Sequence, residues 1–186
     1  MPVKVHLDDV GMAFTTPAGV FRAVAPLNLK IESGRFVSLV GPSGCGKSTL
    51  FNIIAGLLQP TEGRVLIDGE DSTGTIGRVG YMLQKDLLLP WRTVLDNIAL
   101  GMEIRGASLA QARDRAAPLA SKYGLDGFEH RYPNALSGGM RQRAALLRTL
   151  LLDMDLMLLD EPFGALDAQT KARMQEWLLQ LFNDFG

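Results

Sequence analysis

One octapeptide constrains the fold of this chain more than any other segment. Residues 41–48 read Gly-Pro-Ser-Gly-Cys-Gly-Lys-Ser and fit the phosphate-loop pattern G-x-x-x-x-G-K-[ST]. The apolar run 36–40 precedes the motif and indicates a buried strand. A helical pattern follows it, with an apolar stripe at Leu50, Ile53, Ile54 and Leu57. A strand, a glycine-rich turn and a helix in this order predict an α/β protein with a phosphate-binding loop.

Each residue type in the loop suits a nucleotide phosphate. Glycines let backbone N–H groups curl around phosphate oxygens, and the helix N-terminus adds partial positive charge. The Lys47 side chain can reach the β- and γ-phosphates, and the Ser48 hydroxyl can bind Mg²⁺. Cys45 is either a small residue that fits a tight loop or a reactive thiol near the helix N-terminus. The predicted nucleotide-contacting residues of this segment are Gly41, Pro42, Ser43, Gly44, Cys45, Gly46, Lys47, Ser48 and Thr49.

Composition and charge narrow the class of protein. Of the 186 residues, 47% are hydrophobic and 21% are charged, which is ordinary for a globular protein. The formal net charge of -1 argues against nucleic acid as the main partner. The one cysteine excludes an internal disulfide and favours a reducing compartment. The sequence shows neither a signal-peptide core nor an apolar run of membrane-spanning length, so we expect it to serve any membrane process through a partner.

The spacing of apolar residues predicts strands and helices on both sides of the phosphate loop in the sequence. Apolar alternation and β-branched residues predict strands at 3–7, 27–31, 36–40, 65–67, 79–83 and 156–159. Ala, Leu, Arg and Gln at helical spacing predict an inserted helical lobe over 87–152. A final helix is predicted over 169–182, with an apolar face of Met174, Trp177, Leu178 and Leu181. This alternation predicts a mainly parallel α/β core.

Two acidic residues follow the last predicted strand. Asp160 and Glu161 come directly after the apolar run 156–159. Ligands of open parallel sheets bind where the strands end, so this position suits a site. Asp160 can hold Mg²⁺ through water, and Glu161 can accept a proton from an attacking water.

A second glycine-rich turn opens a helix at 137–139. Ser137 is suited to be the N-cap of a helix over 138–151, and Gly138 and Gly139 follow it. A serine hydroxyl, glycine N–H groups and a helix dipole together favour an anion. Consecutive glycines destabilise a helix, so we expect a close backbone approach by a ligand at this turn.

These motifs stand in an order that resembles the nucleotide-binding subunit of ABC transporters. The order is the phosphate loop, Gln84, Leu136–Met140, Asp160-Glu161 and Ala165-Leu166-Asp167. The resemblance covers nearly the whole chain. It implies a P-loop NTPase of the ABC type, with a mainly parallel core sheet, an N-terminal antiparallel β subdomain and an inserted helical subdomain. The implied division is an ATP-binding core over 1–86, a helical subdomain over 87–152 and a return to the core over 153–186.

The resemblance implies that the chain binds and hydrolyses ATP with Mg²⁺. Glu161, Lys47 and Gln84 take the catalytic roles at matching positions. Ser48, Gln84 and Asp160 are the implied metal ligands. Gln84 would also sense the γ-phosphate.

The resemblance also implies that the working unit is a head-to-tail homodimer. The signature turn 137–139 would receive the γ-phosphate held by the opposite chain, and Asp167 would lie across the dimer seam. Phe14 resembles the aromatic residue that stacks on adenine, and Phe21 is its rival.

Further partners follow from the same resemblance. The segment Gln84–Trp91 would contact membrane permease subunits, with Leu87, Leu88, Leu89 and Trp91 either exposed for that contact or packed into the helical lobe. A periplasmic or surface solute-binding protein completes such a system, and the chain would lie peripherally on the cytoplasmic face of the membrane. The sequences of residues 88–91 and 137–143 are similar to those in importers of nitrate, sulfonate and taurine.

The sequence departs from the family pattern twice. Met140 stands where the signature usually has glutamine, which removes an amide contact. The family's switch histidine lies on a strand after the final helix, and neither His6 nor His130 occupies that place. We therefore expect the chain to be C-terminally incomplete.

Two alternative functions remain. The second hypothesis is a truncated module that binds ATP and hydrolyses it poorly. The third hypothesis is a soluble ABC protein that acts on ribosomes or DNA, and the near-neutral charge disfavours it.

Overall fold

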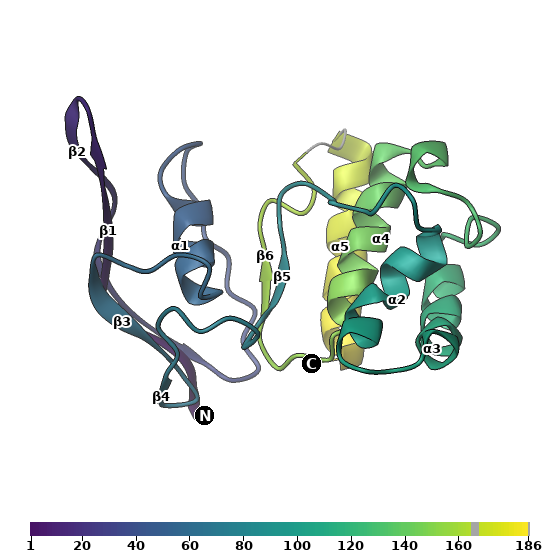
Figure 1. The fold of residues 1–186 in the computed structure, drawn as a ribbon, viewed down its shortest axis with the longest axis horizontal. Helices are drawn as coiled ribbons and strands as arrows, with labels where there is room; N and C mark the ends of the chain where they lie inside the picture. Colours follow the sequence, from purple (N-terminus) through teal and green to yellow (C-terminus); the bar gives the residue numbers. More distant parts are fainter. Residues whose placement is uncertain (165–167, 186) are drawn as a thin grey trace. The chain divides into compact units, whose positions relative to one another are not determined.

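Two sets of secondary structure follow one another along the chain (Figure 1). The structure is a computed structural model, and it describes residues 1–164 and 168–185. It divides the chain into two units, Met1–Val79 and Gly80–Gly186. Within the described residues, no helix is both long enough and apolar enough to cross a membrane.

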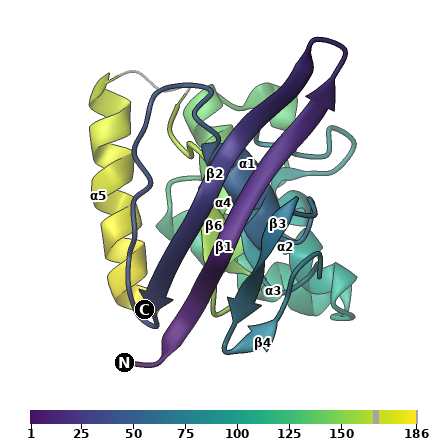
Figure 2. The ribbon, with the colours of Figure 1, turned by 90° about the vertical axis from the view of Figure 1, so that its left-hand side faces the viewer.

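The first unit is built on an antiparallel sheet of order β2-β1-β3-β4 (Figure 2). Its strands are β1 (Val3–Thr16), β2 (Gly19–Glu32), β3 (Glu62–Ile67) and β4 (Glu70–Asp71). Asp68 and Gly69 have φ values of 54° and 80°, which is the left-handed geometry of a two-residue hairpin turn. The strands predicted at 3–7, 27–31 and 65–67 are present, and each extends further than the sequence indicated.

Helix α1 (Lys47–Ile54) lies on one face of this sheet (Figure 1). Leu50, Ile53 and Ile54 of the helix are buried, as their predicted stripe requires. Leu57 was expected on the same stripe, but it lies beyond the helix and is 58% exposed. Gly56, at φ 74°, ends the helix, and the Leu57 and Gly56 N–H groups close a Schellman motif onto the carbonyls of Asn52 and Ile53.

The strand predicted at 36–40 is wrong for this structure. Residues 35–42 have no regular secondary structure, and Phe36, Val37 and Val40 are 46%, 47% and 94% exposed. A strand requires the backbone of a neighbour, and neither described sheet includes this segment. The apolar residues of 36–40 favour a strand, but in the described sheets no neighbouring strand pairs with this segment and buries it.

The second unit combines a parallel strand pair with a helical layer. Strand β5 (Gly80–Met82) pairs in parallel with β6 (Met157–Leu159), which confirms the strands predicted at 79–83 and 156–159. The helical elements are α2 (Val94–Ile104), α3 (Leu109–Lys122), the 3₁₀ turn η1 (Pro133–Ala135), α4 (Gly138–Leu150) and α5 (Ala168–Phe185).

Capping and small residues allow these helices to form and to pack. Thr93, Ser108 and Ser137 cap α2, α3 and α4 with side-chain oxygens that accept backbone N–H groups. Helix α3 presents a fully buried stripe of alanines, which allows close approach by α2 and α4. That stripe is Ala112, Ala116 and Ala120. Trp177 of α5 packs edge-on against Tyr123, with ring centroids 5.2 Å apart.

Truncating the core of the helical layer should destabilise it strongly. Ile98 of α2 is 0% exposed and belongs to the apolar cluster shared by α2, α3 and α4. We expect Ile98→Ala to lower the free energy of unfolding by about 2–5 kcal/mol, because it leaves a cavity. The measurement is urea unfolding followed by far-UV circular dichroism. Ile104→Ala is the matched control on the same helix, since Ile104 is 77% exposed, and equal effects of the two changes would contradict the assignment of the core.

Candidate nucleotide-binding and hydrolysis site

Two glycines shape the phosphate loop in the first unit. Gly44 and Gly46 have φ values of 80° and 98°, a region that side-chain-bearing residues rarely adopt. Gly46 is also the N-cap of α1, and a Cβ there would lie 2.4 Å from the Ala23 carbonyl oxygen of β2. The loop therefore needs glycine at this position for its conformation and for its contact with the sheet.

The loop lysine folds back over the loop. The Lys47 ammonium donates hydrogen bonds to the carbonyls of Gly41 and Pro42 at 2.9 and 3.0 Å. The Sγ atom of Cys45 lies 3.8 Å from the same ammonium, and the Cys45 side chain is exposed. Lys47 is thus held at the loop by backbone oxygens, where its charge adds to that of the helix N-terminus.

The two candidate adenine-stacking rings come from opposite strands of one hairpin. Phe14 of β1 and Phe21 of β2 are direct cross-strand partners, so both rings leave the same face of the sheet. They are 37% and 58% exposed. Phe21 is two residues from Ala23, which the phosphate loop contacts through Gly46. The structure brings both rings together and leaves the choice between them open.

In the second unit, the parallel pair positions the two acidic residues. Asp160 directly follows β6, and its backbone N–H donates to the Met82 carbonyl of β5 at 2.9 Å. Asp160 is 4% exposed. Glu161 is exposed and adopts φ 45°, so the chain turns sharply between the two carboxylates. Because of this turn, the Asp160 side chain is buried and the Glu161 side chain is exposed.

Both acidic residues lie close to side chains at the end of β5. The Gln84 amide Nε2 donates to Glu161 Oε2 at 2.8 Å, although the residues are 77 positions apart. Tyr81 of β5 stands opposite Leu158 of β6, two residues before Asp160, so the Tyr81 and Asp160 side chains leave the same face of the strand pair. Burial, and then the negative charge of Asp160, raise the pKa of Tyr81 to about 12. Sequence reasoning singled out Gln84 and missed Tyr81, because sequence does not give the register of the two strands.

The predicted Mg²⁺ ligands have suitable chemistry. The hydroxyl of Ser48, the amide oxygen of Gln84 and the carboxylate of Asp160 are all oxygen donors, which this cation prefers. Gln84 bonds to Glu161 through its NH₂ group, which leaves its oxygen for another partner. Ser48 lies in the first unit, and Gln84 and Asp160 lie in the second. Each of these side chains, by its own chemistry, is a donor that fits the ion.

Two arginines of α4 hold the segment that follows Gln84. The Arg148 guanidinium donates to the carbonyls of Asp86 and Leu87 at 2.6 and 2.8 Å. Arg141 bridges the Asp86 carboxylate at 3.2 Å and the Leu136 carbonyl at 2.8 Å. Leu136 immediately precedes the signature turn, so one side chain joins the two motifs. Sequence reasoning missed both arginines, since Asp86 and Leu87 lie more than fifty residues from them.

The apolar residues of this segment divide into two groups. Leu87 and Trp91 are 51% and 72% exposed. Leu88 is only 8% exposed and belongs to the helical core, which selects packing into the helical lobe from its two predicted alternatives. Leu89 is half-buried, and the fully buried Asn97 holds its backbone by accepting from its N–H at 2.6 Å and donating to its carbonyl at 3.0 Å. Of these four residues, Leu87 and Trp91 are the ones exposed enough for the predicted contact with a permease subunit.

The signature turn has the geometry that was predicted for it. The Ser137 hydroxyl accepts from the Met140 N–H at 3.3 Å and caps α4. Ser137 and Gly138 are exposed, and a Cβ on Gly138 would meet only the Arg141 guanidinium, 3.9 Å away. Packing within the chain therefore does not require glycine here, which agrees with an approach from outside.

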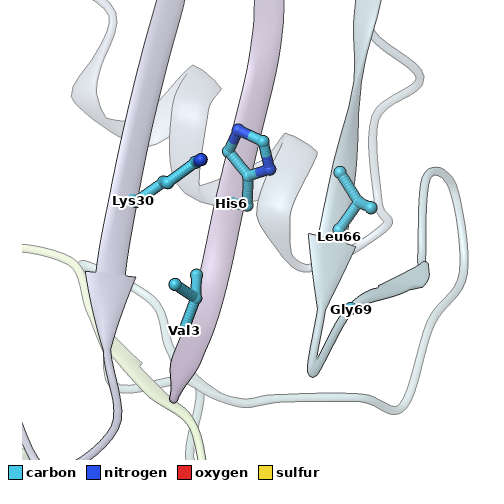
Figure 3. Close-up of a pocket in the computed structure, with 5 residues that line it drawn as sticks. All are labelled: Val3, His6, Lys30, Leu66 and Gly69. Carbon is cyan, nitrogen blue, oxygen red and sulfur yellow. The ribbon is translucent and has the colours of Figure 1, made fainter. Parts of the chain in front are cut away.

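The two histidines, which the sequence did not assign to the site, lie apart from its motifs along the chain. Asp167 lies outside the described residues. His130 is exposed in a turn after α3. His6 lies on β1 and lines a shallow hollow of about 150 Å³ on the sheet with Val3, Lys30, Leu66 and Gly69 (Figure 3). None of these hollow-lining residues belongs to the predicted nucleotide site.

The sequence pattern of the ABC transporter family matches residues 24–164. The chain belongs to the ABC transporter family. This match spans the phosphate loop, Gln84, the signature turn and both acidic residues. The family resemblance inferred from the motifs is confirmed.

Named relatives and a solved structure agree with this assignment. The taurine import ATP-binding protein TauB of Yersinia pestis is 46% identical over 88% of this chain and 64% of its own length. The aliphatic sulfonates import ATP-binding protein SsuB of Bacillus cereus is 43% identical over 97% of this chain and 70% of its own length. The dimeric, post-hydrolysis structure of the ATP-binding cassette MJ0796, bound to ADP and Pi, has a TM-score of 0.86 at 35% identity, covering 98% of this chain and 84% of that chain.

These similarities confirm the predicted fold class and the predicted class of activity. The fold is that of an ABC ATPase cassette, with an antiparallel sheet and a parallel pair. The chain is an ATP-binding ABC subunit of the ATP-hydrolysing kind. The domain boundaries and the roles of individual residues remain predictions.

Removing the Arg148 side chain should loosen the segment after Gln84. Arg148→Ala deletes two charge-assisted hydrogen bonds to backbone carbonyls, and we expect a local loss of about 1–3 kcal/mol. Hydrogen exchange of a peptide covering 84–91 should then quicken about tenfold or more. Arg115→Ala on the exposed side of α3 is the control. Unchanged exchange in Arg148→Ala would show that the arginine does not hold this segment.

Proposed function

We propose that this chain is the ATP-driven subunit of an importer for a small solute, with Glu161 as the general base. The observation that carries the proposal is the Gln84–Glu161 hydrogen bond of 2.8 Å at the end of the parallel strand pair. It holds an exposed carboxylate beside the glutamine that the ABC family pattern assigns to γ-phosphate sensing. A carboxylate held in this way is suited to accept a proton from water.

The phosphate loop supplies the nucleotide-binding half of this proposal. Backbone N–H groups of 41–46, the α1 N-terminus and Lys47 present positive charge to phosphate oxygens. The exposed rings of Phe14 and Phe21 offer a stacking surface for adenine. Ser48, Gln84 and Asp160 would hold Mg²⁺, which neutralises phosphate charge when bound.

A second copy of the chain would complete each site. The exposed Ser137 and Gly138 at the α4 N-terminus offer an anion site, and Asp167 would lie at the seam between copies. The similar cassette MJ0796 is dimeric, which supports a homodimer, and the family resemblance implies its head-to-tail arrangement. Met140 replaces the usual glutamine without removing the N–H groups of the turn.

The exposed pair Leu87 and Trp91 suits contact with a permease subunit. The backbone between them is fixed by Arg148 and Asn97, so a movement of Gln84 would be passed to this surface. We place the chain on the cytoplasmic face of the membrane, with a solute-binding protein on the other side. The names of the relatives support taurine or another sulfonate as the solute, and nitrate remains a candidate from the family resemblance.

A second candidate function is ATP binding with poor hydrolysis. It is favoured by the placement of both histidines away from the acidic pair along the chain, on β1 and in the turn after α3. Steady-state turnover of the 186-residue chain with saturating Mg-ATP separates the candidates. Clear turnover would eliminate this second function.

Replacing the proposed base tests the main proposal. Glu161→Gln keeps the shape of the side chain and removes the proton acceptor, so we expect hydrolysis to fall about 100-fold or more. ATP affinity, measured with a fluorescent ATP analogue, should change little. Glu176→Gln, an exposed position on α5, is the control. Full turnover in Glu161→Gln would remove Glu161 from the catalytic role.

Truncating each ring decides which phenylalanine binds adenine. We expect Phe14→Ala, Phe21→Ala or both to weaken ATP binding, since stacking contributes about 1–3 kcal/mol per base. The same assay with inorganic triphosphate as competitor should show no change, because that ligand has no base. Val20→Ala, a 75% exposed apolar position on the same hairpin, is the control. Equal ATP affinities for all three variants and the unaltered chain would place adenine elsewhere.

A further inference from the structure

One guanidinium contacts both the segment that follows Gln84 and the start of the signature turn. The Arg141 Nε atom donates to Asp86 Oδ2 at 3.2 Å, and its Nη1 atom donates to the Leu136 carbonyl at 2.8 Å. Asp86 follows Gln84 by two residues. Leu136 immediately precedes Ser137, the first residue of the turn. Because a guanidinium is rigid and planar, its two hydrogen bonds hold the carboxylate and the carbonyl in one fixed relation.

The same arginine sets the direction of the first N–H group of the turn. The Leu136 carbonyl and the Ser137 N–H group belong to one planar peptide unit and point in opposite directions. The bond from Arg141 to that carbonyl therefore also orients the Ser137 N–H group. The backbone N–H of Arg141 donates in addition to the Ser137 carbonyl at 3.0 Å. Arg141 thus holds the backbone on both sides of Ser137, at the place proposed for the γ-phosphate.

The guanidinium also lies beside the exposed face of the turn. Its Nη2 atom is 3.9 Å from the position that a Cβ on Gly138 would take. Ser137 and Gly138 are both exposed, so this is the face that an anion would approach. The positive charge of Arg141 therefore adds to that of the α4 N-terminus at this face.

Asp86 is held through both of its carboxylate oxygens. Its Oδ2 atom faces Arg141, and its Oδ1 atom accepts from the Leu88 N–H at 3.2 Å. Arg148 donates to the carbonyls of Asp86 and Leu87, so the backbone here is fixed as well. A movement of this segment therefore changes the position of the oxygen to which Arg141 is bound.

We propose that Arg141 is a positioning residue of the signature turn, and that its bond to Asp86 links the turn to the segment that follows Gln84. When a permease displaces the segment, the Asp86 carboxylate moves and Arg141 turns the peptide unit that precedes Ser137. The two side chains are 37% and 30% exposed, and ion pairs as exposed as this contribute little to stability, so the role of the bond is geometric. The inference rests on the proposed function, in which the turn receives the γ-phosphate of a second copy.

Asp86→Asn tests the link from the end that does not touch the turn. The amide oxygen can still accept from the Leu88 N–H, whereas an NH₂ group replaces the oxygen that faces Arg141, and two donors do not bond to each other. The variant is made in a Glu161→Gln background, in which ATP persists. We expect the dissociation constant of the ATP-bound dimer, measured by sedimentation equilibrium, to rise about tenfold, because the turn is no longer held ready for phosphate. Asp114→Asn, at an exposed acid of α3, is the matched control and should leave it unchanged.

ADP separates the signature turn from the phosphate loop. This nucleotide lacks the γ-phosphate, so its binding depends on the phosphate loop of one chain. We expect the affinity for a fluorescent ADP analogue to be the same in Asp86→Asn, in Arg141→Ala and in the parent. Equal losses of ADP affinity and of dimer affinity would indicate general damage to the fold and overturn the inference.

Arg141→Ala and the double variant decide whether the two side chains act through one bond. We expect Arg141→Ala to weaken the dimer at least as much as Asp86→Asn, and the double variant to be no weaker than Arg141→Ala. If Arg141→Ala weakens the dimer and Asp86→Asn does not, Arg141 supports the turn locally and the link is overturned. Effects that multiply in the double variant would show two independent side chains and would also overturn the link.

The Glu161→Gln parent separates this inference from the function on which it rests. If the parent forms no dimer with ATP, the proposed role of a second copy fails and the inference fails with it. If the parent and both single variants dimerise equally well, the proposed function stands and the role of Arg141 is overturned.

Hydrogen exchange measures the link in a single chain without nucleotide. We expect Asp86→Asn to quicken exchange of a peptide covering 136–143 about tenfold, although Asp86 and Arg141 are 55 positions apart. A peptide covering α3, residues 109–122, is the internal reference and should be unchanged. Unchanged exchange at 136–143, or equal quickening in both peptides, would overturn the link.

Discussion

The parallel pairing of β5 with β6 is the interaction on which the candidate hydrolysis site depends. The strands run in the same direction with Met82 opposite Leu159, so the residues that follow them emerge at one edge. The bond from the Asp160 N–H to the Met82 carbonyl extends this ladder by one residue. Gln84 thereby comes within hydrogen-bond distance of Glu161, and Tyr81 lies on the same face as Asp160. A shift of the pairing by one residue would turn these side chains to the opposite face.

A second set of contacts connects this edge to the signature helix. Asp86 follows Gln84 by two residues and accepts a hydrogen bond from Arg141, which also donates to the carbonyl of Leu136. Arg148, seven residues further along α4, holds the next two carbonyls of the segment. The helical layer is therefore held to the residues after β5 by hydrogen bonds from guanidinium groups to backbone carbonyls. Such bonds keep their geometry better than a surface ion pair does. These ties fix the backbone of Asp86 and Leu87, two and three residues after Gln84.

Much of the fold and of the candidate site could be predicted because their signals are local. The phosphate loop, the Ser137 cap and the hairpin at Asp68-Gly69 each depend on a few adjacent residues with special backbone angles. The strand at 36–40 and the extension of the apolar stripe to Leu57 were wrong for a common reason. Apolar pattern measures the tendency to be buried, whereas burial also requires a partner strand or a continued helix.

The sequence by itself determined the family, the phosphate loop, the signature turn and the order of the acids. These are fixed by residue type and spacing along the chain, so no tertiary information is needed to recognise them. Only the tertiary structure decided that Gln84 bonds to Glu161, that Arg141 joins Asp86 to Leu136, and that Leu88 is core while Trp91 is exposed. The reason is that these contacts join segments far apart in sequence, and their geometry depends on strand register and helix packing that residue spacing does not encode.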